Sequence, residues 1–170
     1  MRLLLTTLTL LAPLPALAQT TPVAPIVKGT ALPPPADDEA AVLAPLNAWF
    51  AGIDAADADA IRAQLRIGGG GGATVAGTRA TGESFVRHLT WEEYLANIKP
   101  GEHKYQERFT SAPAVEIDGD IAMVWGAFTL YEDGKPRTCG VDHFDLIREN
   151  GQWKVQNVTW SQRTTGCAAQ

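Results

Sequence analysis

The stretch that decides the fold is residues 139–160, which read CGVDHFDLIRENGQWKVQNVTW. Two runs rich in β-branched and aromatic residues flank the dipeptide Asn150-Gly151. Asn-Gly between such runs is among the strongest short signals for a two-residue β-hairpin turn. The stretch therefore predicts a hairpin of two strands, 139–148 and 152–163.

Further strands are predicted on the N-terminal side of this hairpin. Residues 104–111 alternate in character, and residues 114–117 and 121–131 form two apolar runs. The turn Asp118-Gly119-Asp120 separates those two runs. Together with the hairpin they predict an antiparallel meander of about four strands, and a short earlier strand is predicted at 84–89.

Helices are predicted before the meander. One apolar stripe follows the helical spacing of four, three and four residues, and its members are Val42, Leu46, Trp49 and Ile53. Asp57 is placed to cap a second short helix, and Thr90 with Glu93 forms a capping box for a third. Helices followed by a meander predict an α+β domain over residues 37–167, in which N-terminal helices pack on a strongly curved antiparallel sheet.

The first residues have the pattern of a cleavable signal peptide. Arg2 supplies a positive charge, residues 3–14 are mostly apolar, and Ala16-Leu17-Ala18 is a small-x-small cleavage pattern. The apolar run is too short to span a bilayer, which needs roughly 20 residues. We therefore expect cleavage after Ala18, a periplasmic or secreted protein without stable membrane association, and a Pro-rich leader over residues 19–36.

Export changes how the two cysteines are interpreted. In an oxidising compartment Cys139 and Cys167 are expected to form a disulfide, although two buried thiols or a catalytic thiol remain alternatives. Two cysteines and three scattered histidines do not form a metal-binding pattern, and no metal or cofactor is expected. A net charge of −5 argues against a nucleic-acid partner. The run Gly68–Gly72 lacks the residues of a phosphate-binding loop and is interpreted as a flexible loop.

Three stretches resemble the nuclear transport factor 2-like superfamily, and within it the SnoaL-like and ketosteroid-isomerase-like branch. They are AVLAPLNAWFAGIDAADADAI at 41–61, VEIDGDIAMVWGAFTLYEDG at 115–134 and CGVDHFDLIRENGQWKVQNVTW at 139–160. The resemblance implies a cone-shaped half-barrel whose concave face and helices enclose an apolar pocket. It also makes the outer face of the sheet a candidate contact for a homodimer.

The resemblance and the alternation of the last hairpin together select pocket residues. Counted without gaps, His143 falls where ketosteroid isomerases place a pocket acid, and Trp160 matches their inward tryptophan. Trp49 falls at their pocket tyrosine. Their general base falls near Ala73, where no carboxylate exists, so steroid isomerisation is not expected.

Alternation around Asn150-Gly151 places His143 on one face with Val141, Val158 and Trp160. A one-residue bulge would exchange the faces, and Asp142, Asn157 and Thr159 would then be the polar residues to test. The predicted ligand-binding residues are Trp49, Trp125, Val141, Val158 and Trp160. His143 is the candidate catalytic residue because imidazole titrates near neutrality, and the alternative is a structural histidine.

Three functions follow from these predictions. The first is an exported protein that binds a small hydrophobic molecule in the pocket. The second is a dehydratase, cyclase or isomerase in which His143 transfers a proton. The third is a structural or interaction module whose pocket is filled by its own side chains.

Overall fold

The computed structural model describes residues 36–79 and 81–167. The predictions for the signal peptide at 1–18 and for the leader up to residue 35 lie outside this part of the chain. Within the described ranges no helix is both long enough and apolar enough to cross a membrane.

Over residues 36–79 and 81–167 three helices form where the caps and the apolar stripe predict them: α1 (Ala36–Ala55), α2 (Ala58–Arg62) and α3 (Trp91–Leu95). The stripe on α1 is buried, with Val42 and Leu46 fully inaccessible to solvent. The Asp57 carboxylate accepts from the Ala60 N–H at 2.9 Å and starts α2. Thr90 and Glu93 form the predicted capping box at the start of α3.

In the described part of the chain seven strands form one mixed sheet in the spatial order β2-β1-β7-β6-β5-β3, and β4 also pairs with β5. Their bounds are β1 (Gly72–Thr78), β2 (Ser84–Thr90), β3 (Tyr105–Phe109), β4 (Ala114–Asp118), β5 (Ile121–Glu132), β6 (Lys135–Glu149) and β7 (Gln152–Gln162). The strands β4 and β3 pair with opposite halves of β5. Asn150 and Gly151 both adopt positive φ, as the predicted hairpin turn requires.

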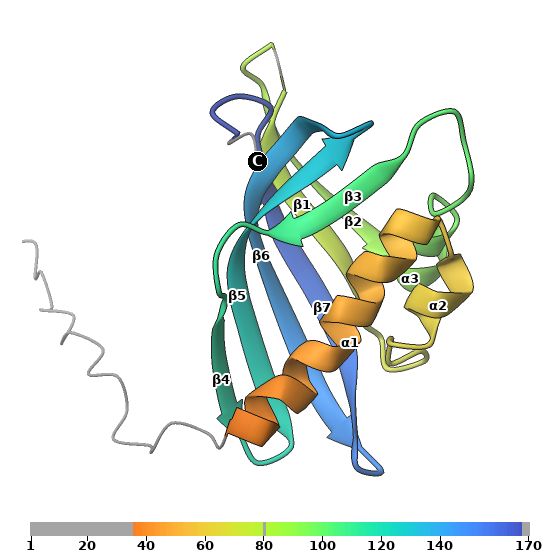
Figure 1. Ribbon diagram of the computed structural model, residues 1–170, viewed down its shortest axis with the longest axis vertical. Helices are drawn as coiled ribbons and strands as arrows, with labels where there is room; N and C mark the ends of the chain where they lie inside the picture. Colours follow the sequence, from red (N-terminus) through yellow and green to blue (C-terminus); the bar gives the residue numbers. More distant parts are fainter. Residues whose placement is uncertain (1–35, 80, 168–170) are drawn as a thin grey trace, which may run out of the picture. The chain divides into compact units, whose positions relative to one another are not determined.

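The α+β architecture is confirmed: α1 crosses one face of the sheet, and α2 and α3 lie near the C-terminal end of α1 (Figure 1). One strand was not predicted from the sequence. Residues 72–78 form β1, which pairs parallel with the end of β7 and antiparallel with β2.

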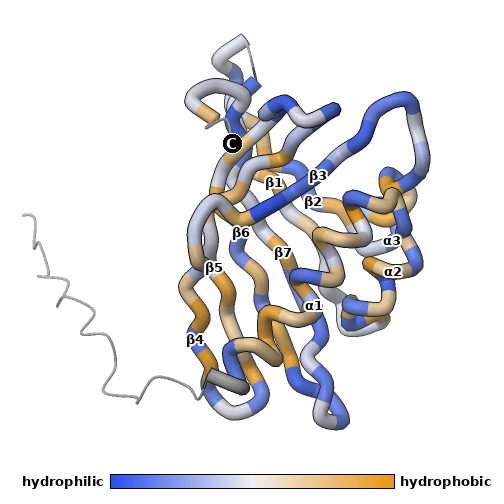
Figure 2. The backbone as a smooth tube through the Cα atoms, in the orientation of Figure 1, coloured by the Kyte–Doolittle hydropathy of each residue, from blue (hydrophilic) through white to orange (hydrophobic). Residues whose placement is uncertain are grey.

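The core lies between α1 and the sheet. Apolar residues gather along α1 and on the strands that it crosses (Figure 2). Trp49 is 1% exposed and contacts three aromatic rings, with centroids 5.8 Å from Trp91, 5.1 Å from Tyr94 and 5.6 Å from Phe144.

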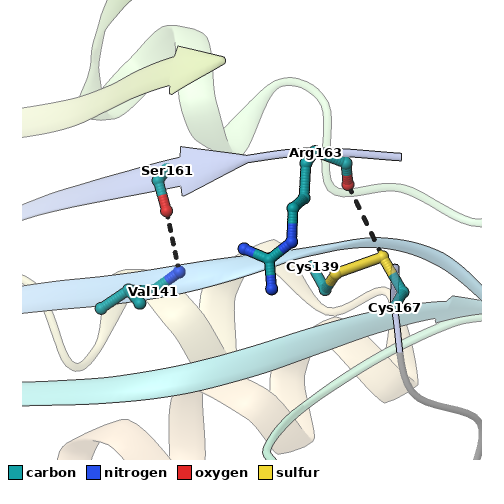
Figure 3. The surroundings of a disulfide bond; sticks show 5 residues. All are labelled: Cys139, Val141, Ser161, Arg163 and Cys167. Carbon is teal, nitrogen blue, oxygen red and sulfur yellow. Dashed lines mark hydrogen bonds between the residues drawn. A yellow bond between two sulfur atoms is a disulfide. The ribbon is translucent and has the colours of Figure 1, made fainter. Parts of the chain in front are cut away.

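The predicted disulfide is confirmed. Cys139 on β6 is bonded to Cys167 beyond β7, with the two Cα atoms 5.5 Å apart (Figure 3). Cys139 and Arg163 exchange two backbone hydrogen bonds of 3.0 Å, and the Val141 N–H donates to the Ser161 hydroxyl at 3.0 Å. The disulfide therefore links the segment after β7 to the N-terminal part of β6, at the open end of the β6–β7 hairpin.

Candidate functional site

A cavity of about 260 Å³ opens between the C-terminal part of α1, the segment around α3 and the concave face of the sheet. This volume is far more than one water molecule needs. The chain's own side chains do not fill this space, so the predicted alternative of a self-filled pocket is not supported. The apolar pocket implied by the resemblance is present.

The walls of the cavity are mainly aromatic and aliphatic. Trp49 and Ile53 come from α1, Phe128 and Leu130 from β5, Phe144 from β6, and Val158 and Trp160 from β7. Flat side chains on several sides are suited to a flat apolar ligand, because ring faces then contact ring faces.

A buried carboxyl group interrupts this apolar lining. Asp142 on β6 is 3% exposed, and its Oδ2 atom has no hydrogen-bond partner among the described residues. Burial, and secondarily the neighbouring Glu107 carboxylate, raise the pKa of Asp142 well above its ordinary range. A buried polar atom without a partner is costly to a fold and often marks a functional position.

A second carboxyl group enters the same cavity from β3. Glu107 is half-buried and lies on the face of the strand that also carries Tyr105 and Phe109. Burial raises the pKa of Glu107 to about 7. Because the Glu107 carboxylate raises the pKa of Asp142, the two groups are considered together and are hereafter called the carboxyl pair.

The described groups around the carboxyl pair offer it no buried cation. Burial, followed by the charge of Glu107, raises the pKa of Tyr94 well above its ordinary value, so this phenol stays neutral. The Tyr105 hydroxyl donates to Glu132 at 2.8 Å. Among the described residues that line the cavity, the one basic side chain is Lys99, which is exposed.

A more open groove adjoins the cavity between α3 and the strands β1 and β2. Tyr94, Ile98 and Trp160 line both spaces. These side chains therefore lie between the cavity and the groove, and a ligand longer than the cavity would enter the groove past them.

The prediction that the His143 ring enters the cavity is wrong. His143 pairs across strands with Trp125, and their ring centroids lie 5.8 Å apart on the opposite face of the sheet. Trp125 is 52% exposed there, and neither residue lines the cavity. The nearest acidic contact of His143 is Asp145, with Nε2 and Oδ1 separated by 3.4 Å.

A β-bulge in β7 explains this error. Asp145 pairs with Asn157 and Leu146 with Val155, so Gln156 is left without a partner and the register shifts by one residue. Beyond the bulge Val158 and Trp160 face inward with Phe144 and Asp142 instead of with His143.

The glycine run lies against this bulge. The Gln156 side chain accepts from Arg66 at 2.9 Å and donates to the Gly69 carbonyl at 3.0 Å. A Cβ atom on Gly71 would lie 1.7 Å from the Gln156 carbonyl oxygen, so only glycine fits at this position. The run is thus the turn that passes the bulge before β1 begins.

The remaining predicted site residues divide between the two faces. Trp49, Val158 and Trp160 line the cavity as expected, whereas Trp125 and Val141 do not. Of the other histidines, His88 contacts the Thr74 hydroxyl at 3.0 Å, and His103 contacts Asp133 at 2.7 Å.

Asp142 was expected in the cavity only if a bulge exchanged the faces, and Glu107 was not predicted as a site residue. Glu107 alternates with Tyr105 and Phe109, and Asp142 alternates with Phe144 and Leu146, so each acid stands alone on an otherwise apolar or aromatic strand face. An isolated acid in such a series was the available signal. That the two acids face one cavity depends on how β3 and β6 are placed around β5.

Comparison with known proteins agrees with this architecture. Residues 37–161 match the model of a protein family described as "Putative lumazine-binding". No curated protein matches the chain.

Several solved structures share the fold. The β subunit of a protein described as a putative aromatic-ring-hydroxylating dioxygenase, from Novosphingobium aromaticivorans, has a TM-score of 0.61 at 10% identity, over 78% of this chain and 94% of that one. A nuclear transport factor 2-like protein of unknown function from Methylobacillus flagellatus has a TM-score of 0.55 at 16% identity, over 79% and 99%. A protein described as a putative dehydratase of the same fold group, from Streptomyces avermitilis, has a TM-score of 0.53 at 15% identity, over 75% and 96%. At these identities the likeness is one of fold.

Proposed function

The chain belongs to the family described as putative lumazine-binding, with a nuclear transport factor 2-like fold, and on that premise we propose that its cavity binds a small, flat, largely apolar molecule. The observation that carries this proposal is the cavity of about 260 Å³ with aromatic walls and a buried, unpartnered Asp142 oxygen. Its size suits a ligand of one or two rings, because pockets for drug-sized ligands are generally larger, from about 300 Å³ upward.

Binding of lumazine tests the proposal directly, because lumazine is a flat two-ring heterocycle named in the description of the family. We expect lumazine to quench the fluorescence of the cavity tryptophans Trp49 and Trp160. Replacing Ile98, which lies in the wall between cavity and groove, by Trp should weaken binding at least about tenfold by filling the space.

The matched control is Ile67→Trp, the same change at an exposed side chain outside the cavity, and it should leave the affinity unchanged. Native mass spectrometry of the purified chain would show whether a molecule co-purifies. The proposal would be overturned if no molecule co-purifies and neither lumazine nor the small aromatic amine and alcohol used as probes below binds.

The predicted enzymatic alternative loses its main support. His143 lies outside the cavity, so it cannot transfer a proton to a molecule bound there. We therefore propose a binding protein and assign no proton-transfer role to this histidine.

We also propose that a second copy of the chain covers the outer face of β5 and β6, defined as the face opposite the cavity. Ile121 and Trp125 are 56% and 52% exposed on this face, and exposed apolar side chains that cluster mark interaction sites. Trp125→Glu should shift the chain from dimer to monomer in sedimentation velocity. Val86→Glu, at an exposed position on β2, should not, and a wild-type chain that sediments as a monomer would contradict the proposal.

The N-terminal pattern and the disulfide support a further proposal, that the chain is exported and loses residues 1–18. Disulfides persist chiefly in oxidising compartments, and Cys139–Cys167 is the kind of bond that a small exported domain uses.

A further inference from the structure

We propose that the molecule held in this cavity carries a protonated amine, and that Glu107 and Asp142 together bind this cation within the aromatic walls. The inference rests on the proposed function and specifies the charge of the ligand. Its geometric basis is the convergence of two carboxyl groups, one on β3 and one on β6, on one largely apolar cavity.

The first observation is the missing partner of Asp142. This side chain is 97% buried, lines the cavity and leaves Oδ2 without a hydrogen bond among the described residues. An acceptor in this state lacks a donor, and an ammonium group supplies up to three. A hydrogen bond between charged groups is also stronger than one between neutral groups.

The second observation is that no cationic side chain among the described residues is buried beside the pair. A buried carboxyl group ionises readily only beside a cation, because the desolvation of an unpaired charge is costly, and a cationic ligand would supply that partner. On the described elements around the pair, α1 contributes no charged group to the lining, and β5 and β7 contribute none either. Helix α3 contributes neutral Tyr94, the segment after it contributes exposed Lys99, and β3 contributes Tyr105 beside Glu107.

The third observation is the aromatic wall. Trp49, Tyr94, Phe144 and Trp160 line the same space as the two carboxyl groups. Ring faces attract cations, and the attraction is largest when the cation is desolvated. A cationic head with an apolar body therefore satisfies both the carboxyl pair and the walls, whereas a neutral molecule satisfies the walls alone.

Proton linkage gives the proposal a pH signature. Burial raises the pKa of Glu107 to about 7 and that of Asp142 well above its usual range, so the empty pair retains protons near neutral pH. A bound ammonium group favours the ionised pair, and binding must then release a proton to solvent. The affinity for an amine should therefore rise with pH through about 7, by at most about tenfold per pH unit for each proton released.

Two probes of nearly equal shape test the inference: 2-phenylethylamine, which stays protonated near neutral pH, and neutral 2-phenylethanol. Isothermal titration of the mature chain is carried out from about pH 5.5 to about pH 8. At the upper end of this range the amine should bind at least about tenfold more tightly than the alcohol. This preference should shrink as the pH falls. Titration in buffers of different ionisation enthalpy should show proton release with the amine and none with the alcohol.

Two isosteric variants assign the effect to the carboxyl pair. Glu107→Gln and Asp142→Asn should each remove the preference for the amine while the alcohol still binds. The control Asp118→Asn, at the exposed end of β4, should keep the preference. Because the wild-type comparison of the two probes stands by itself, a variant that folds poorly does not remove the test.

The outcomes separate this inference from the proposed function. Equal affinities for amine and alcohol at all pH values, or a preference that survives both variants, would overturn the inference and leave the proposed function intact. If neither probe binds while lumazine does, the inference again fails alone. If lumazine, amine and alcohol all fail to bind, both proposals fall.

Discussion

Replacing Trp49 by Ala is expected to lower the free energy of unfolding by about 3–5 kcal/mol. The side chain is 1% exposed, and its ring joins α1 to Trp91 of α3 and Phe144 of β6. The substitution would leave a cavity that extends the existing one, and the rigid strands around it cannot close the gap. Such a loss is a large share of the 5–15 kcal/mol that is typical of a domain. Urea denaturation followed by circular dichroism measures it.

Trp125→Ala is the matched control, because it removes the same side chain from a 52% exposed position. At a protein concentration where the chain is monomeric, this variant should change stability by no more than about 0.5–1 kcal/mol. Equal losses for the two variants would mean that α1 is not held to the sheet by Trp49.

Removal of the disulfide is expected to have the second largest effect. The double variant Cys139→Ala with Cys167→Ala should lose about 3–4 kcal/mol, because the bond closes a loop between residues 28 positions apart and restricts the unfolded chain. The backbone bonds between Cys139 and Arg163 remain, so the native fold should still form.

Chemical unfolding of the wild-type chain with and without a reductant gives the same quantity without a substitution. Exported protein should begin at Gln19, and its mass should be about two units lower than that of its reduced form. Protein that retains Met1 and has two thiols open to alkylation would contradict both export and the disulfide. A stability that reduction does not change would show that the loop is already restricted in the unfolded state.

Much of the fold follows from local patterns. The burial of the stripe on α1, the caps at Asp57 and Thr90 and the turn at Asn150-Gly151 each depend on a few neighbouring residues. Helix and strand periodicities and capping geometry act over such short distances, so a single sequence displays them. The disulfide was also predictable, because two cysteines in an oxidising compartment leave one pairing.

The strand β1 was not predictable in the same way. Four glycines precede it and a fifth begins it, and its residues Ala73 and Val75 pair in parallel with the distant strand β7. Parallel pairing joins segments that are far apart along the chain, and no local turn announces it.

The walls of the cavity and its polar groups differ in how far they could be predicted. The sequence by itself determined that an α+β domain would enclose an apolar space walled by Trp49, Val158 and Trp160, since these positions follow from periodicity and from the resemblance. Only the tertiary structure decided which polar groups enter that space. The bulge at Gln156 turned His143 outward relative to Val158 and Trp160, and the pairing of β3 and β6 with β5 brought Glu107 and Asp142 together. Side chains alternate along a strand with a period of two, so one inserted residue reverses every assignment beyond it, and where that residue sits is decided by packing between segments that are distant in the sequence.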